Sequence, residues 1–483
     1  MKLSMLIAAA TAAVSVALAG CSGSSNSIVE APVERPEVKP AAKNVIFFLG
    51  DGMGITTMTA ARIYKVGEEG DLTLDTLPET GFVTTYSNDA QVTDSAPSMA
   101  AYMTGIKANN EVISMSANTS ARDAGGKSYV SGADSTCPSG NGTPADTLLE
   151  IMKAKGYSTG VVTTTRITHA TPAATYSHIC HRDGENNIAA QLTPKGAGFN
   201  GKLTNGVDVI FGGGRRHFLP KTDADSKRSD SRDLVAEFKA AGYTYAANSA
   251  DFDKISNTAP KVVGLFNKDH MTYDLDRDAA KEPSLAQMTG KSIDLLNSKK
   301  TGFFLMVEGG RIDHALHATN ARRALQETVA FDDAIKVALD KMQQVDPGLK
   351  NTLVVVTADH DHSILLNGYA KRTGKTTGSE PGVLGVVKNV LTGQPERDIN
   401  GNPYTVIGFG NGPNHLAARG ALSDMQVADK DYMQESVIPT EAGGETHGGT
   451  NVFIGAQGMG AENIRGVLDN SEVFGLVKKA VGL

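Results

Sequence analysis

Residues 44–51 read Asn-Val-Ile-Phe-Phe-Leu-Gly-Asp, an unbroken apolar run that ends in a glycine and an acid. Such a run is typical of a β-strand buried on both faces, as in a parallel sheet. Similar segments lie at residues 159–165, 207–211, 262–266, 302–307 and 352–357. Because helical patterns alternate with these strands, the sequence predicts an α/β fold. We expect a three-layer sandwich with a mostly parallel central sheet and helices on both faces.

Three helical patterns are the clearest. The first covers residues 144–155 and ends at a glycine, the second runs from Asp313 through about Met342, and the third covers residues 471–481. Residues 364–440 are rich in glycine, with one predicted strand at residues 404–409. We interpret them as an irregular insertion over the rim of a site.

The 483-residue chain is long enough for one large α/β domain or two smaller ones. Its formal net charge of −7 argues against nucleic acid as a specific partner, because binding phosphate backbones needs a basic surface.

The N-terminus has the pattern of an export signal. Lys2 is followed by an apolar run that is too short to span a bilayer and ends in Leu-Ala-Gly-Cys at residues 18–21. This ending resembles a bacterial lipobox, which implies cleavage before Cys21 and lipid attachment to it; an ordinary secretory peptide is the alternative. We therefore expect a signal peptide (1–20), a flexible tether (21–42) and one domain (43–483). The expected location is lipid-anchored, at the outer membrane or in the periplasm of a Gram-negative bacterium.

A second informative stretch is Thr-Asp-Ser-Ala-Pro-Ser at residues 93–98. The proline suits the first turn of a helix, and an apolar helical pattern follows it. Ser95 would then lie at a helix N-terminus, where free N–H groups favour an anion such as a phosphoryl group. The alternative is an Asp-Ser helix cap without catalytic function.

Metal-ligand residues follow several of the predicted strands. Glu308 ends one strand, and Asp313 and His317 lie four residues apart on one helical face, where they can bind one metal ion. A solvated Asp–His pair is the alternative. The next strand is followed by Asp-His-Asp-His at residues 359–362, a run that is costly to bury without a cation.

Other polar residues at strand ends fit the same pattern. Asp51 follows the first strand, Thr171 lies in the loop after the strand at residues 159–165, and His447 precedes a late apolar strand. Arg182 has a guanidinium that matches phosphate oxygens, although taken alone an arginine here is better explained as a surface residue. Because the carboxyl ends of parallel strands share one edge, we expect one site.

Together these stretches resemble the alkaline phosphatases. The matching segments are 51–54, 93–96, 169–172, 308–317, 357–360 and 445–447, with Arg182. The resemblance implies hydrolysis of phosphate monoesters through a phosphoserine on Ser95, with Arg182 holding phosphate oxygens, in a homodimer. It also implies two zinc ions, one bound by Asp313, His317 and His447 and one by Asp51, Asp359 and His360 beside Ser95. One magnesium ion would be bound by Asp51, Thr171 and Glu308.

Some residues of the expected site vary among members of the family. His169 and His314 stand where the best-known bacterial member has Asp and Lys, whereas the animal enzymes have His at both positions. Asn267 stands where animal enzymes place a glutamate on calcium. Cys137 and Cys180 fall near places where animal members carry a disulfide, which an exported chain could form.

Three other functions are alternatives. A sulfatase or a phosphodiesterase would share the superfamily fold, but Met99 stands where the sulfatase nucleophile motif needs arginine. A metal- or phosphate-binding lipoprotein without activity would lack one or more catalytic groups, and none is missing.

Overall fold

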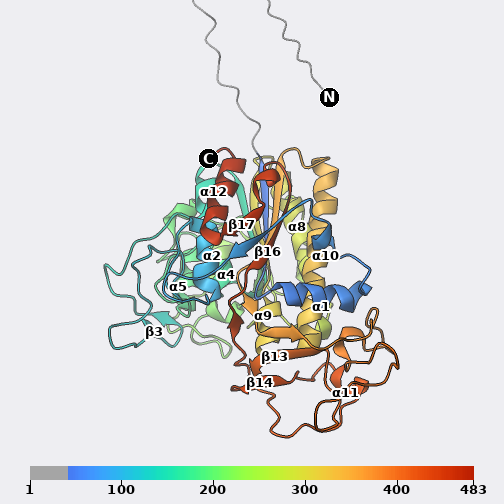
Figure 1. Ribbon diagram of the computed structural model, residues 1–483. Coiled ribbons are helices and arrows are strands. Elements are labelled where there is room, and N and C mark those ends of the chain that lie inside the picture. The colour runs from blue at the N-terminus through green and yellow to red at the C-terminus, as the bar shows by residue number, and fades with distance from the viewer. Residues whose placement is uncertain (1–41) are drawn as a thin grey trace, which may run out of the picture. The chain divides into compact units, whose positions relative to one another are not determined.

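The computed structural model describes residues 42–483 (Figure 1). The expected signal peptide and almost all of the expected tether lie outside these residues. The described chain is built on a ten-stranded sheet. In spatial order its strands are β17 (Gly466–Asp469), β2 (Glu79–Thr84), β16 (Val452–Gly458), β10 (Thr352–Ala358), β1 (Asn44–Gly50), β9 (Phe303–Gly309), β5 (Ser158–Arg166), β6 (Val209–Gly213), β8 (Val262–Leu265) and β7 (Thr244–Ala246).

The first apolar run of the sequence forms β1 at the centre of this sheet. It pairs in parallel with β9 on one side and with β10 on the other. From β10 to β7 all neighbouring strands are parallel, whereas β16 runs antiparallel to both β10 and β2. The predicted α/β fold with a mostly parallel sheet is confirmed.

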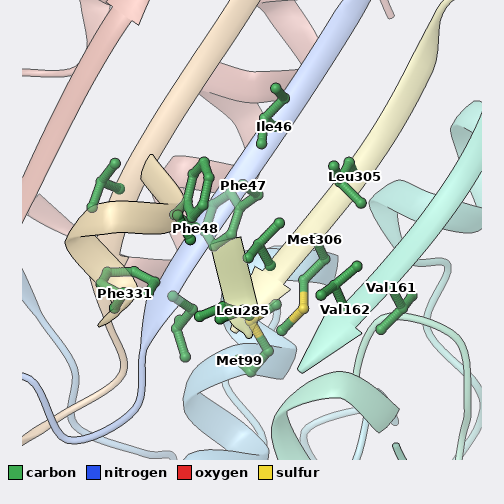
Figure 2. Packing of buried hydrophobic residues seen from close by; sticks show 14 of the residues in the cluster. Ile46, Phe47, Phe48, Met99, Val161, Val162, Leu285, Leu305, Met306 and Phe331 are labelled. Carbon is green, nitrogen blue, oxygen red and sulfur yellow. The ribbon is translucent and has the colours of Figure 1, made fainter. Parts of the chain in front are cut away.

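Successive side chains of β1 show why helices cover both faces. Phe47 packs against Tyr102 of α2 (Ser95–Thr104), with ring centroids 5.6 Å apart. Phe48 points to the other face and packs edge-on against Phe331 of α10 (Ala321–Val345), at 5.8 Å (Figure 2). Because alternate residues of a strand face opposite sides, a run without polar residues needs an apolar layer on each side.

The helices form these two layers. Figure 1 shows α2, α4 and α12 on one side of the sheet and α8 and α10 on the other. The remaining helical bounds are α1 (Ile55–Val66), α3 (Leu148–Ala154), α4 (Ala170–Ala173), α5 (Glu185–Leu192), α6 (Leu234–Ala240), α7 (Ser249–Asp253), α8 (Leu285–Ser298), α9 (Arg311–His317), α11 (Asp424–Val427) and α12 (Asn470–Ala480). Within residues 42–483, no helix combines the length and the apolar character needed to cross a membrane.

Two predicted helices have different bounds. The single helix expected from Asp313 to Met342 is two helices, α9 and α10, because Thr319 has a left-handed backbone (φ 51°) and the Asn320 side chain caps a new helix. The helix expected from residue 144 begins at Leu148. Thr147 and Glu150 form a capping box there, a start signal that the apolar pattern alone does not show.

Residues 364–440 contain a small sheet in the order β12 (Ile364–Leu366), β13 (Ile407–Gly412) and β14 (Ser436–Pro439). The strand expected at residues 404–409 is therefore displaced towards residue 412. Figure 1 places β13, β14 and α11 together at one end of the described chain.

The expected disulfide is present. Cys137 is bonded to Cys180, with their Cα atoms 6.0 Å apart. Cys137 follows the hairpin of β3 (Val130–Ser131) and β4 (Asp134–Ser135), and Cys180 lies two residues before Arg182. The bond therefore ties the segment that carries Arg182 to a loop 43 residues earlier in the chain.

Candidate active site

Three buried acids lie at the carboxyl ends of the central strands, and we call Asp51, Glu308 and Asp359 the carboxylate cluster. β1 and β10 are paired up to their last residues. Asp51 directly follows β1 and Asp359 directly follows β10, so these two acids lie side by side. Glu308 lies opposite Leu49 in the register of β1 with β9. All three side chains are fully buried. Strand register thus brings Asp51 together with two acids that lie 257 and 308 residues later in the sequence.

Asp51 and Asp359 share a group of potential ligands with His360. His360 Nε2 lies 3.5 Å from Asp51 Oδ1 and 3.6 Å from Asp359 Oδ2. Ser95 Oγ is 3.3 Å from His360 Nε2 and 3.4 Å from Asp51 Oδ1. The structure therefore places Ser95 directly beside this group.

Ser95 is the first residue of α2, as the sequence predicts. Asp94 is the N-cap, and its side chain accepts a hydrogen bond of 2.7 Å from the Ala96 N–H. The helix cap and the position of a nucleophile are thus not alternatives, because Asp94 caps the helix while Ser95 faces the ligand group.

A second group of potential metal ligands consists of residues of α9 and a histidine that precedes β16. His317 Nε2 is 3.2 Å from Asp313 Oδ1 and 3.1 Å from His447 Nε2. His447 Nε2 is 3.5 Å from the same Asp313 oxygen. Two imidazole nitrogens and a carboxylate oxygen that all face one another suit a tetrahedral metal ion with an open fourth position.

His362 and Glu445 support this second group, and the sequence predicts no role for either residue. His362 Nε2 lies 2.9 Å from Asp313 Oδ1, and His362 Nδ1 lies 2.5 Å from Glu445 Oε2. Burial alone would lower the pKa of His362, but these two carboxylates raise it to about 10. The protonated ring therefore fixes the orientation of Asp313. A close approach also explains Gly52, which has φ +68° and whose missing Cβ would lie 2.5 Å from His362 Nε2.

A third group of potential ligands, all of them oxygens, includes the second carboxylate oxygen of Asp51. Thr171 Oγ lies 3.4 Å from Asp51 Oδ2. Glu308 Oε2 accepts hydrogen bonds from Thr163 and Thr165, whereas its Oε1 is buried without a partner. Oxygen ligands of this kind suit magnesium.

The electrostatics of the carboxylate cluster fit bound cations. Burial and the neighbouring acids raise the pKa of Asp51 well above its usual range, and burial raises that of Glu308 to about 8. The pKa of Asp359 is also raised, mainly by burial. Asp359 Oδ2, like Glu308 Oε1, is buried without a hydrogen-bond partner. Divalent cations would supply the partners and favour the ionised carboxylates.

Arg182 is anchored at the open side of the site. Its Nη1 lies 3.1 Å from Asp94 Oδ1 and its Nη2 lies 3.1 Å from His169 Nε2. Arg182 and Asp94 both line a cavity of about 650 Å³ whose wall also includes Glu111 and Arg122. An arginine held by an aspartate beside a nucleophile can present its remaining N–H donors to an anion that enters from this cavity.

His314 and Asn267, which the sequence comparison within the family also points to, lie in different surroundings. His314 lies in α9 next to Asp313, with its ring near that of His169. Asn267 donates a hydrogen bond of 2.7 Å to Glu282.

Known proteins resemble this chain over most of its length. The family model described as alkaline phosphatase matches residues 42–483. An alkaline phosphatase of Gadus morhua is 35% identical over 466 residues, which cover 90% of this chain and 91% of that protein. The tissue-nonspecific isozyme of Homo sapiens is 34% identical, covering 89% of this chain and 82% of the relative.

Solved structures show the same fold. A cold-active alkaline phosphatase from Shewanella sp. aligns with a TM-score of 0.62 and 25% identity, over 91% of this chain and 99% of that one. The enzyme from Thermus thermophilus aligns with a TM-score of 0.65 and 23% identity, over 92% of each chain.

Proposed function

Since this chain belongs to the alkaline phosphatase family and hydrolyses phosphate monoesters, we propose that it does so through a phosphoserine intermediate on Ser95. The family match does not favour a sulfatase, a phosphodiesterase or a binding protein without activity. The observation that carries the proposal is the position of Ser95 Oγ, 3.3–3.4 Å from two members of a buried ligand group. The residue before it, Asp94, holds Arg182.

The metal ions that fit the donor sets are two zinc ions and one magnesium ion. The first zinc position comprises Asp313, His317 and His447, the second Asp51, Asp359 and His360, and the magnesium position Asp51, Thr171 and Glu308. Mixed imidazole and carboxylate sets suit zinc, and the all-oxygen set suits magnesium. When bound, the ions lower the pKa of the serine hydroxyl and of water, and they stabilise negative charge in the transition state.

Ser95 Oγ loses its proton to solvent and attacks phosphorus, and the bond from phosphorus to the ester oxygen breaks. The ester oxygen leaves with the bonding electrons and takes a proton from water, which gives the alcohol. Arg182 holds non-bridging oxygens with N–H donors that are not used by Asp94 and His169. Water then attacks the phosphoserine, which releases inorganic phosphate and restores Ser95. Asp94 keeps Arg182 in place throughout, because it is itself fixed as the N-cap of α2.

Acid-quenched labelling with a ³²P-phosphomonoester tests the nucleophile. We expect label on Ser95 in the wild-type protein and none in Ser95→Ala. Ser292→Ala is the matched control, since Ser292 is a buried serine of α8 whose hydroxyl bonds to the Met288 carbonyl of its own helix. Label on another residue in Ser95→Ala, with hydrolysis retained, would refute the assignment.

We also propose that the chain is lipidated on Cys21 and forms a homodimer. Lipidation is supported by the Leu-Ala-Gly-Cys pattern at residues 18–21, and the dimer by the family resemblance. Mass spectrometry of the mature N-terminus and sedimentation of the purified protein test these two statements separately.

A further inference from the structure

Three histidines from separate parts of the chain gather beside the carboxylate cluster, and we call His169, His270 and His314 the histidine cluster. His169 follows β5, His270 lies in the loop after β8, and His314 lies in α9. The ring centroids of His270 and His314 are 4.2 Å apart, and those of His169 lie 5.2 and 5.3 Å from the other two. One nitrogen of each ring lies within 4.8 Å of the others.

One nitrogen of this cluster has no partner within the protein. His169 Nδ1 is buried and makes no hydrogen bond to any described residue, whereas His169 Nε2 is taken by Arg182. A buried nitrogen without a partner is costly, and a metal ion is one of the few groups that can satisfy it.

Three arginines contact the rings of the cluster. Arg311 Nη1 lies 3.0 Å from His314 Nδ1, and the backbone N–H of Arg166 donates to His270 Nδ1 over 3.2 Å, so a metal ion has to bind through the other nitrogen of each of these two rings. The other two contacts come from arginine side chains that are also paired with acids. Arg166 pairs with Glu185 and Asp269, and Arg182 pairs with Asp94. The guanidinium of Arg166 also contacts His270 Nε2, so a cation at that nitrogen has to displace this contact. Arg166 would still retain both of its acidic partners.

We propose that His169, His270 and His314 form an additional site for a transition-metal ion with affinity for imidazole, Zn²⁺ being the first candidate. This site is separate from the two zinc positions and the magnesium position proposed above. Three imidazoles supply three ligands of a tetrahedral ion and leave one position open to water. Imidazole nitrogen suits zinc, copper and nickel and is a poor ligand for magnesium or calcium.

The test is the number of zinc ions bound per chain, measured by equilibrium dialysis and elemental mass spectrometry with magnesium in excess. We expect three zinc ions and one magnesium ion in the wild-type protein, and two zinc ions and one magnesium ion in His270→Gln. Affinity for the third zinc should fall at least about 100-fold, because even the loss of an outer-shell partner costs 10–100-fold. His415→Gln is the matched control, since His415 lies near β14, within residues 364–440, and bonds to Ser436 O.

The same measurement separates this site from its neighbours. His169 also lies within ligand distance of Asp51 and Glu308, but an ion held there does not need His270. A third zinc that persists in both His270→Gln and His314→Gln would therefore overturn the proposal, as would a wild-type protein that binds only two. The second variant keeps the test valid if the first does not fold. Phosphomonoester hydrolysis by both variants, measured in parallel, reports on the proposed function independently of the zinc count.

Discussion

The carboxylate cluster and the histidine cluster lie side by side, but the chain builds them in different ways. The carboxylate cluster comes from parallel strands whose register places three acids at one edge. The histidine cluster comes from two loops and a helix. Burial raises the pKa values of the acids and lowers those of the histidines, so that it favours the neutral form in both clusters. The difference is that a bound cation favours the ionised form of the acids, whereas neutral imidazole is already the form that binds a cation.

The largest expected effect comes from breaking the carboxylate cluster at Asp51, which belongs both to the group with Asp359 and His360 and to the group with Glu308. We expect Asp51→Asn to lower kcat/KM for a chromogenic phosphomonoester by about 10²–10⁴-fold, since losing one metal partner costs at least 10–100-fold and Asp51 serves two positions. Metal content should fall in parallel.

Asp332→Asn is the control for this substitution. Asp332 is a buried acid of α10 that accepts a hydrogen bond from the Leu74 N–H, and it is not a member of the candidate site. Activity lost equally in both variants would mean that the effect is a general cost of replacing a buried acid.

The sequence predicts the carboxylate cluster better than the histidine cluster, for a physical reason. Asp51 and Asp359 directly follow apolar runs, and parallel strands bring such positions to a common edge. His270 is a lone histidine in a loop, and its distance from His314 depends on loop conformations that no periodicity describes. The break between α9 and α10 is also not visible in the apolar pattern, because it depends on the left-handed backbone of Thr319. The grouping of the ligands into two zinc sets and one magnesium set rests on the family resemblance.

A smaller effect concerns Arg182, which contacts His169 of the histidine cluster and Asp94, the residue before Ser95. We expect matched aryl esters to show a preference for the monoester of about 10²–10⁴-fold in kcat/KM. A diester lacks one charged oxygen, so it loses a contact to Arg182 and one to the magnesium position, and each contact is worth roughly 1.5–3 kcal/mol. Arg182→Ala should reduce this preference by about 10–150-fold.

Arg122→Ala is the control for Arg182, since Arg122 lines the same cavity but pairs with Glu111. It should leave the ratio of monoester to diester hydrolysis unchanged. A diester preference in the wild-type protein would contradict the roles given to Arg182 and to the magnesium position.

The smallest effect is on the stability of protein that EDTA has stripped of metal. The free energy of unfolding should change with pH in opposite directions for the two clusters. Glu308 has a pKa of about 8 in the folded chain against 4.5 for an ordinary glutamate. Between these values the folded state holds a proton that the unfolded state has released, so the free energy of unfolding falls as pH rises. His314 has a pKa of about 3 against 6.5. Between these values the unfolded state holds the extra proton, so the free energy of unfolding falls as pH drops. Each group contributes a slope of about 1.4 kcal/mol per pH unit within its own range.

The contributions of Glu308 and His314 to the pH dependence of stability oppose each other between about pH 4.5 and 6.5. Above this range only Glu308 contributes, and below it only His314 does. We therefore expect urea unfolding of the metal-free protein to show a loss of stability from pH 6.5 to 8, which Glu308→Gln reduces. We also expect a loss below pH 4.5, which His314→Gln reduces. Adding zinc and magnesium should suppress the alkaline loss, because the cations favour the ionised carboxylates that the fold otherwise disfavours. A metal-free protein whose stability does not fall between pH 6.5 and 8 would show that the carboxylate cluster ionises without cost, and the argument that it requires cations would then fail.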